Sequence, residues 1–177
     1  MLDFSKYMYY NFNKKYAKEV LKMSNEIMVI PEEYLKKSKE ELRGTAKKLY
    51  DSAVSGLYYN KEFNPDFEAD KSTIKMLIDS YIYAMCCSDG SVNQSELDFM
   101  TFLNSDMHSK EWQAAMPHQL TKDETEFLTS ISISDAFDPG IARNIIRTAL
   151  IAAVIDTSSV NAEENDALLD LLSYVGF

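Results

Sequence analysis

A long apolar face at helical spacing is the feature that most constrains how this chain folds. Apolar residues recur at positions i, i+3, i+4, i+7, i+8 and i+11, namely Ile74, Leu77, Ile78, Tyr81, Ile82 and Met85. An α-helix of about 3.6 residues per turn places all of them on one side for three turns. Because no stretch alternates polar and apolar residues for the length of a strand, the sequence predicts an all-α helical bundle.

Motifs typical of helix starts indicate further helices. A Ser or Thr followed three residues later by Glu forms a capping box, in which the hydroxyl accepts a backbone N–H and the carboxylate reaches back to the first residue. Ser38 begins such a motif and predicts a helix that reaches about Tyr59, and Thr121 begins another. Asp138, directly before Pro139, predicts one more helix start.

Two of the predicted helices carry apolar faces of their own. The helix expected to begin at Asn93 has an inward face that consists of Leu97, Met100 and Leu103. The face after Pro139 consists of Ile141, Ile145, Ala149, Ala152 and Ile155. Residues 105–120 give no clear periodicity.

Charge divides the 177 residues into two unequal parts. Residues 1–61 carry 12 Lys and Arg against 8 Asp and Glu, whereas residues 62–177 carry 6 against 20, so the net charges are +4 and −14. The turn residues Asn64 and Pro65 lie near this change of sign. We therefore expect a basic, Tyr-rich helical extension over residues 1–61, packed on a helical domain that covers residues 71–177.

The charge and the cysteines limit the partners and the location. An acidic surface argues against nucleic acid and favours cations or a basic protein. For the extension, packing on the bundle, docking to a partner protein, contact with a membrane surface and, least favoured, binding of nucleic acid are alternatives. The chain has no apolar run of the roughly 20 residues that a membrane span needs, and no secretory signal pattern. Cys86 and Cys87 are adjacent and form no redox or disulfide motif, so we expect a cytoplasmic protein; the oligomeric state stays open.

An internal repeat organises the acidic part. Residues 83–103 align without gaps to residues 151–171. The identical pairs include Ala84 with Ala152, Val92 with Val160, Asn93 with Asn161, Glu96 with Glu164 and Leu103 with Leu171. The repeat predicts two helix–turn–helix units related by a pseudo-two-fold axis.

At the repeated residues the sequence resembles the TerB-like family, helical domains associated with tellurite resistance. The shared pattern is a small-residue apolar helix, an Asp-Gly turn, a linker with Val and a Glu early in the next helix. It covers about residues 71–177, with Asp89 and Gly90 at the first turn, whereas the second turn has Asp156 one position early and no Gly. The resemblance implies an all-α bundle without catalytic activity that takes part in metal-linked or chemical stress responses through an acidic surface.

The repeated Asn-x-x-Glu motif has two interpretations. Asn93 and Asn161 each fit a helix N-cap whose Glu completes a capping box. Alternatively, the two turns lie side by side and gather carboxylates around Ca²⁺ or Mg²⁺. The candidate ligands are Asp89, Glu96, Asp156, Glu163 and Glu164. Because such a cation needs about six oxygen ligands, one turn alone cannot form the site.

The remaining residues predict no active site. His108 and His118 have no soft ligands beside them, so we expect histidines in loops or on the surface and no zinc site. Cys86 and Cys87 have no sequence neighbour that would activate a thiol, so we expect two small buried apolar residues. The chain also lacks a Gly-rich phosphate loop. The sequence thus predicts a non-enzymatic binding module linked to chemical or metal stress; the alternative is an acidic immunity or inhibitor protein that binds a basic partner protein.

Overall fold

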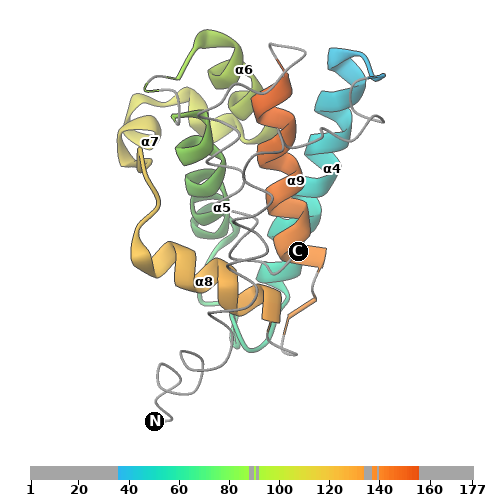
Figure 1. The fold of residues 1–177 in the computed structure, drawn as a ribbon. Helices are drawn as coiled ribbons and strands as arrows, with labels where there is room; N and C mark the ends of the chain where they lie inside the picture. Colours follow the sequence, from blue (N-terminus) through green and yellow to red (C-terminus); the bar gives the residue numbers. More distant parts are fainter. Residues whose placement is uncertain (1–35, 88–89, 91, 134–136, 139, 156–177) are drawn as a thin grey trace, which may run out of the picture.

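The structure is a computed structural model that describes residues 36–87, 90, 92–133, 137–138 and 140–155. The helices are α4 (Lys39–Tyr58), α5 (Lys71–Cys86), α6 (Gln94–Leu103), the 3₁₀ helix η1 (Ser105–His108), α7 (Lys110–Ala115), α8 (Lys122–Ile133) and α9 (Gly140–Val154). The described residues contain no strand, so the predicted all-α fold is confirmed (Figure 1). No helix in these ranges is both long and apolar enough to cross a membrane.

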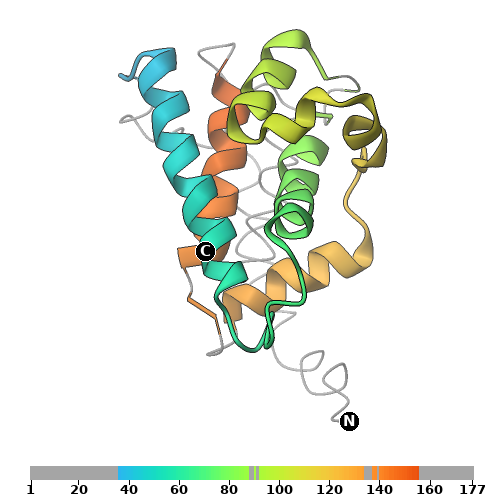
Figure 2. The same ribbon diagram turned by 180° about the vertical axis from the view of Figure 1, so that it is seen from behind.

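Helices α4, α5 and α9 form the centre of the bundle. They contact one another, and α8 lies across the end of the bundle opposite α6 (Figures 1 and 2). Gly56 permits the close approach of α4 and α9, because a Cβ atom there would lie 2.8 Å from Cγ1 of Ile141. The Tyr81 hydroxyl donates to the carbonyl of Glu124 at 2.6 Å and so ties α5 to α8.

The apolar faces predicted for α5 and α9 form most of the core. Every residue of the predicted face on α5 is buried except Leu77, which is half-buried. On α9 and just after it, all five predicted residues are buried. These residues share one core with six from α4, namely Leu42, Ala46, Tyr50, Ala53, Val54 and Leu57. Helix α4 is therefore packed into the same core as the acidic part of the chain.

The predicted helix starts are also present. The Ser38 hydroxyl accepts the Glu41 N–H at 3.2 Å, and the Glu41 carboxylate accepts the Ser38 N–H at 2.8 Å, which completes the capping box of α4. Thr121 and Glu124 make the same exchange at 3.3 and 2.7 Å before α8. The Asp138 side chain accepts the N–H of Gly140 at 2.7 Å at the start of α9.

The structure refines the face of α6 and completes the region that the sequence left open. Of the three residues predicted to face inward, Met100 and Leu103 are buried and Leu97 is half-buried against the core. Glu96 and Phe99 are buried on the same helix in addition. Residues 105–120 contain η1 and α7.

The internal repeat is only partly covered by the structure. Helices α5 and α9 contain the apolar helices of the two predicted copies and contact each other. The second turn and its following helix, like residues 1–35 of the predicted extension, lie outside the described residues. The pseudo-two-fold repeat therefore stays a prediction.

Candidate functional site

The N-terminus of α6 carries the first copy of the repeated motif. The Asn93 side chain accepts the Glu96 N–H at 3.1 Å, and the Glu96 carboxylate accepts the Asn93 N–H at 2.8 Å. The capping-box interpretation is therefore confirmed for this copy. Gly90, in the preceding turn, has a φ of 97°, in the left-handed region that favours glycine.

Only one of the five candidate cation ligands belongs to the described residues. That residue is Glu96, which is 2% exposed and has one carboxylate oxygen engaged by the Asn93 N–H. The other four, Asp89, Asp156, Glu163 and Glu164, lie outside the described residues. Within the described part of the chain, no group of three or more His, Cys, Asp or Glu side chains is placed to hold a metal ion. The described residues alone do not fit Ca²⁺ or Mg²⁺, and the five-residue site stays a prediction.

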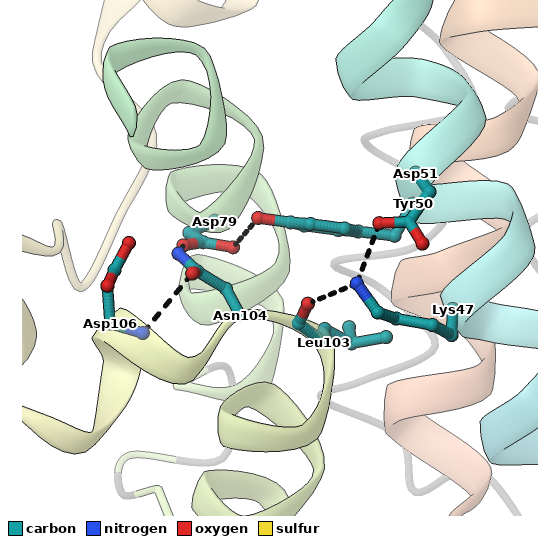
Figure 3. A network of polar contacts seen from close by, with 7 residues as sticks. All are labelled: Lys47, Tyr50, Asp51, Asp79, Leu103, Asn104 and Asp106. Carbon is teal, nitrogen blue, oxygen red and sulfur yellow. Dashed lines mark hydrogen bonds and ion pairs between the residues drawn. The ribbon is translucent and has the colours of Figure 1, made fainter. Parts of the chain in front are cut away.

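The polar centre of the bundle is the carboxylate of Asp79 on α5, which the sequence analysis missed. Asp79 is 1% exposed and accepts three hydrogen bonds. The Tyr50 hydroxyl donates to Oδ1 at 2.8 Å, and the Asn104 amide donates to Oδ2 at 2.7 Å (Figure 3). The indole N–H of Trp112 also donates to Oδ2, at 3.1 Å. One carboxylate therefore joins α4, α5, α7 and the residue that ends α6.

Burial controls the protonation of this network. It raises the pKa of Asp79 to about 6, although the three hydrogen bonds act in the opposite direction. The pKa of Tyr50 is also raised, first by burial and then by the adjacent Asp79 carboxylate. Tyr50 therefore keeps its proton as a neutral donor at physiological pH.

The contacts around Asn104 fix the corner between α6 and η1. Its side-chain oxygen accepts the N–H of Asp106 at 3.2 Å, while its backbone N–H donates to the carbonyl of Met100 at 2.8 Å. Nearby, the ammonium of Lys47 donates to the Leu103 carbonyl at 3.0 Å and lies 2.7 Å from Oδ1 of Asp51 (Figure 3). The Lys47 contact with the Leu103 carbonyl holds the end of α6 against α4, and the Asn104 contacts fix the turn from α6 into η1, so the network has a structural role.

The fold also pairs a cysteine with a distant histidine. Cys86 and Cys87 are buried and His108 and His118 are exposed, as predicted. The sequence offers no histidine near the cysteines, but the fold brings Nδ1 of His118 to 3.4 Å from Sγ of Cys87. The His118 ring also lies edge-on to Tyr83, with centroids 5.9 Å apart. These contacts hold the segment between α7 and α8 against the end of α5.

An open groove of about 670 Å³ lies on the surface beside α6. Its lining combines side chains of both charges with apolar and amide groups, namely Arg43, Gln94, Leu97, Asp98, Thr101, Phe102, His108, Lys110 and Gln113. The Nε atom of Arg43 is buried there without a hydrogen-bond acceptor among the described residues. The groove does not reach the Asp79 carboxylate, whose partners are not among its lining residues.

Comparisons with protein families, with characterised proteins and with solved structures found no match. The resemblance to the TerB-like family therefore rests on the repeated motif alone. The function is therefore inferred from the side chains of this chain.

Proposed function

We propose that this chain is a non-enzymatic helical binding module of the TerB-like kind and that its partner is a basic protein. The observation that carries the proposal is the placement of negative charge. Among the described carboxylates after residue 61, only Asp79 and Glu96 are buried. Those that are exposed are Glu62, Asp66, Glu68, Asp70, Asp98, Glu111, Asp123, Glu126 and Asp138.

Little of this surface charge is neutralised within the described part of the molecule. The ion pairs there join Lys47 to Asp51 and Lys122 to Glu126, so Glu126 is the one member of the exposed set that is paired in these ranges. In the described part of the chain after residue 61, nine exposed acidic residues outnumber five exposed basic residues, and such an excess of negative charge attracts a partner of opposite sign and accelerates its association. A basic protein is the partner that matches this surface.

The buried polar groups support a role without catalysis. A catalytic acid or nucleophile has to reach a substrate. Both oxygens of Asp79 are engaged by side chains of the fold, and the Cys87 thiol is buried against His118. These groups stabilise the bundle, which leaves the exposed surface for binding.

The gene's neighbours discriminate between two settings for such a module. Neighbouring tellurite-resistance genes favour the stress-linked role that the TerB resemblance implies. A neighbouring toxin or secreted-effector gene favours an immunity protein that blocks a basic partner by charge complementarity.

The proposal is tested by binding of the full chain to two labelled peptides. Arginine alternates with glycine in the first, and glutamate replaces arginine in the second. We expect saturable binding of the arginine peptide that weakens as salt rises, because screening acts beyond about 8 Å at physiological ionic strength. No saturable binding at low salt, or equal binding of the glutamate peptide, contradicts the proposal.

A further inference from the structure

Three aromatic rings, two of them exposed and one half-buried, form a cluster where α4 ends and the loop of residues 60–70 begins. The centroids of Tyr58 and Tyr59 are 4.9 Å apart, and the Phe67 ring lies 5.2 Å from Tyr58 and 6.0 Å from Tyr59. Tyr59 is 60% exposed and Phe67 is 47% exposed. We call these three residues the aromatic platform. The ring pairs are edge-to-face or tilted, and because aromatic pairs mainly stabilise cores and interfaces, exposed rings packed in this way indicate an interaction site.

The loop that carries Phe67 is fixed by its own side chains. The buried Asn64 amide donates to the carbonyls of Tyr58 at 3.3 Å and Ala69 at 2.9 Å, and its oxygen accepts the Ala69 N–H at 3.0 Å. Phe67 has a φ of 53°, in the left-handed region that disfavours a residue with a Cβ atom. The loop therefore holds the Phe67 ring outward against its backbone preference, and such strain is typical of functional sites.

The platform already accommodates one cation. The ammonium of Lys71 lies 5.0 Å from the ring centroid of Tyr58 and 5.5 Å from that of Tyr59. Both distances are within the range of about 6 Å over which a ring face attracts a cation. The faces of Tyr58 and Tyr59 can therefore hold a cationic side chain, and in this structure Lys71 lies over them.

The loop that follows Tyr58 and Tyr59 and carries Phe67 is rich in carboxylates. The acidic residues of the segment are Glu62, Asp66, Glu68 and Asp70, and all are exposed. The pKa of Asp70 is lowered by the backbone N–H of Thr73, so this carboxylate is charged at neutral pH. Against these four acids the loop itself contains one basic residue, Lys61.

We propose that the aromatic platform and its acidic loop are the docking surface for an arginine-bearing segment of the basic partner. This inference rests on the proposed function and names the surface that performs it. A planar guanidinium stacks on an aromatic face while its N–H groups donate to carboxylates, so one arginine uses both features of the site. Lys71 occupies the same ring faces and competes with the incoming arginine.

The first test compares two phenylalanines of equal exposure. Phe67→Gly removes one platform ring and relieves the left-handed backbone, so it leaves the fold intact. Phe102→Ala on α6 removes a ring that is also 47% exposed. With the full chain and the arginine peptide, we expect Phe67→Gly to weaken binding roughly three- to tenfold and Phe102→Ala to leave it unchanged.

The second test compares charges. Glu68→Gln and Glu111→Gln each remove one exposed negative charge, and we expect the first to weaken binding more. Lys71→Ala and Lys110→Ala each remove one exposed positive charge, and we expect only the first to strengthen binding clearly, because it vacates the ring faces.

The outcomes separate the surface from the function. If the wild-type chain binds the peptide but the paired variants have equal effects, the platform is not the docking surface and the proposed function stands. If the wild-type chain does not bind, the proposed function itself is wrong. If Phe67→Gly dissociates a dimer of this chain in sedimentation, the platform is a contact between two copies and the inference is also wrong.

Discussion

The two buried carboxylates of the described structure, Asp79 and Glu96, are satisfied in opposite ways. Glu96 accepts the N–H of Asn93, three residues earlier, as part of a capping box. Asp79 takes its hydrogen bonds from Tyr50, Asn104 and Trp112, which lie 29, 25 and 33 residues away. The first carboxylate fixes one helix end, whereas the second fixes the positions of several helices relative to one another.

This difference has consequences for stability. Loss of a local cap affects one helix terminus, whose backbone can turn to water. Loss of Asp79 leaves two buried donors, Tyr50 and Asn104, and the half-buried indole of Trp112 without an acceptor, and water cannot reach the two buried donors unless the bundle opens. The Asp79 network should therefore be the more sensitive of the two regions.

The largest expected effect is that of Asp79→Ala. It removes the acceptor of three hydrogen bonds and should lower the free energy of unfolding by roughly 3 to 5 kcal/mol. Asp79→Asn is the matched control, because its carbonyl can accept from Asn104 and Trp112 while its amide donates to the Tyr50 hydroxyl. Urea unfolding measures both variants. Equal losses for Ala and Asn would show that charge, rather than hydrogen bonding, is the main contribution of Asp79.

The next effect is the dependence of stability on pH that the raised pKa of Asp79 produces. Burial raises the pKa of Asp79 to about 6, whereas an unfolded Asp titrates near pH 3.9. The folded state therefore binds the proton more tightly, and the stability of wild type relative to Asp79→Asn should fall as pH rises from about 4 to about 6 and then level off. The change should be about 3 kcal/mol.

The indole of Trp112, the single tryptophan of the chain, reports the same titration by fluorescence. Glu41 gives a control of opposite sign, because hydrogen bonds from Ser38 lower its pKa. The stability that Glu41 contributes is present above its ordinary pKa of 4.5 and is lost as the pH falls through the lowered pKa. If the stabilities of wild type and Asp79→Asn differ by the same amount at every pH from 4 to 7, the raised pKa of Asp79 is contradicted.

The contrast between the two carboxylates also explains what the sequence could predict. Helix starts at Ser38, Asn93 and Thr121 were correct, because a capping box lies within four consecutive residues. The faces of α5 and α9 were correct because burial follows helical periodicity. These signals are local, so they fix the helices and most of the core.

Contacts between distant residues could not be predicted in the same way. Asp79 is an acidic residue beside the apolar face of α5, and this was the available signal of a buried polar network; its three donors lie on separate elements. The pairing of Cys87 with His118 and the packing of Phe67 on Tyr58 likewise depend on the path of the loops. The proposed docking surface was missed for that reason, although the acidic charge that led to a basic partner was evident from the composition.

A smaller effect is expected at the local cap. Asn93→Ala removes the side-chain oxygen that accepts the Glu96 N–H and should cost about 1 kcal/mol, with or without divalent metal. Ser38→Ala at the exposed start of α4 is the control and should cost a similar amount. Thermal unfolding in chelator and in millimolar CaCl₂ measures both. A cost that appears only in CaCl₂ contradicts the capping role.

The smallest effect is expected for Glu96→Gln, and it decides whether the same carboxylate also binds a cation. Gln keeps an oxygen that can accept the Asn93 N–H, so in chelator the substitution should cost about 0.5 kcal/mol or less. It removes the negative charge that Ca²⁺ or Mg²⁺ requires. If the predicted site exists, wild type gains stability with the logarithm of free metal and Glu96→Gln loses that gain, as does Asp89→Asn. If Glu96 only caps α6, wild type and Glu96→Gln respond equally to metal. We expect the equal response, because the carboxylate is buried and already engaged at the helix start.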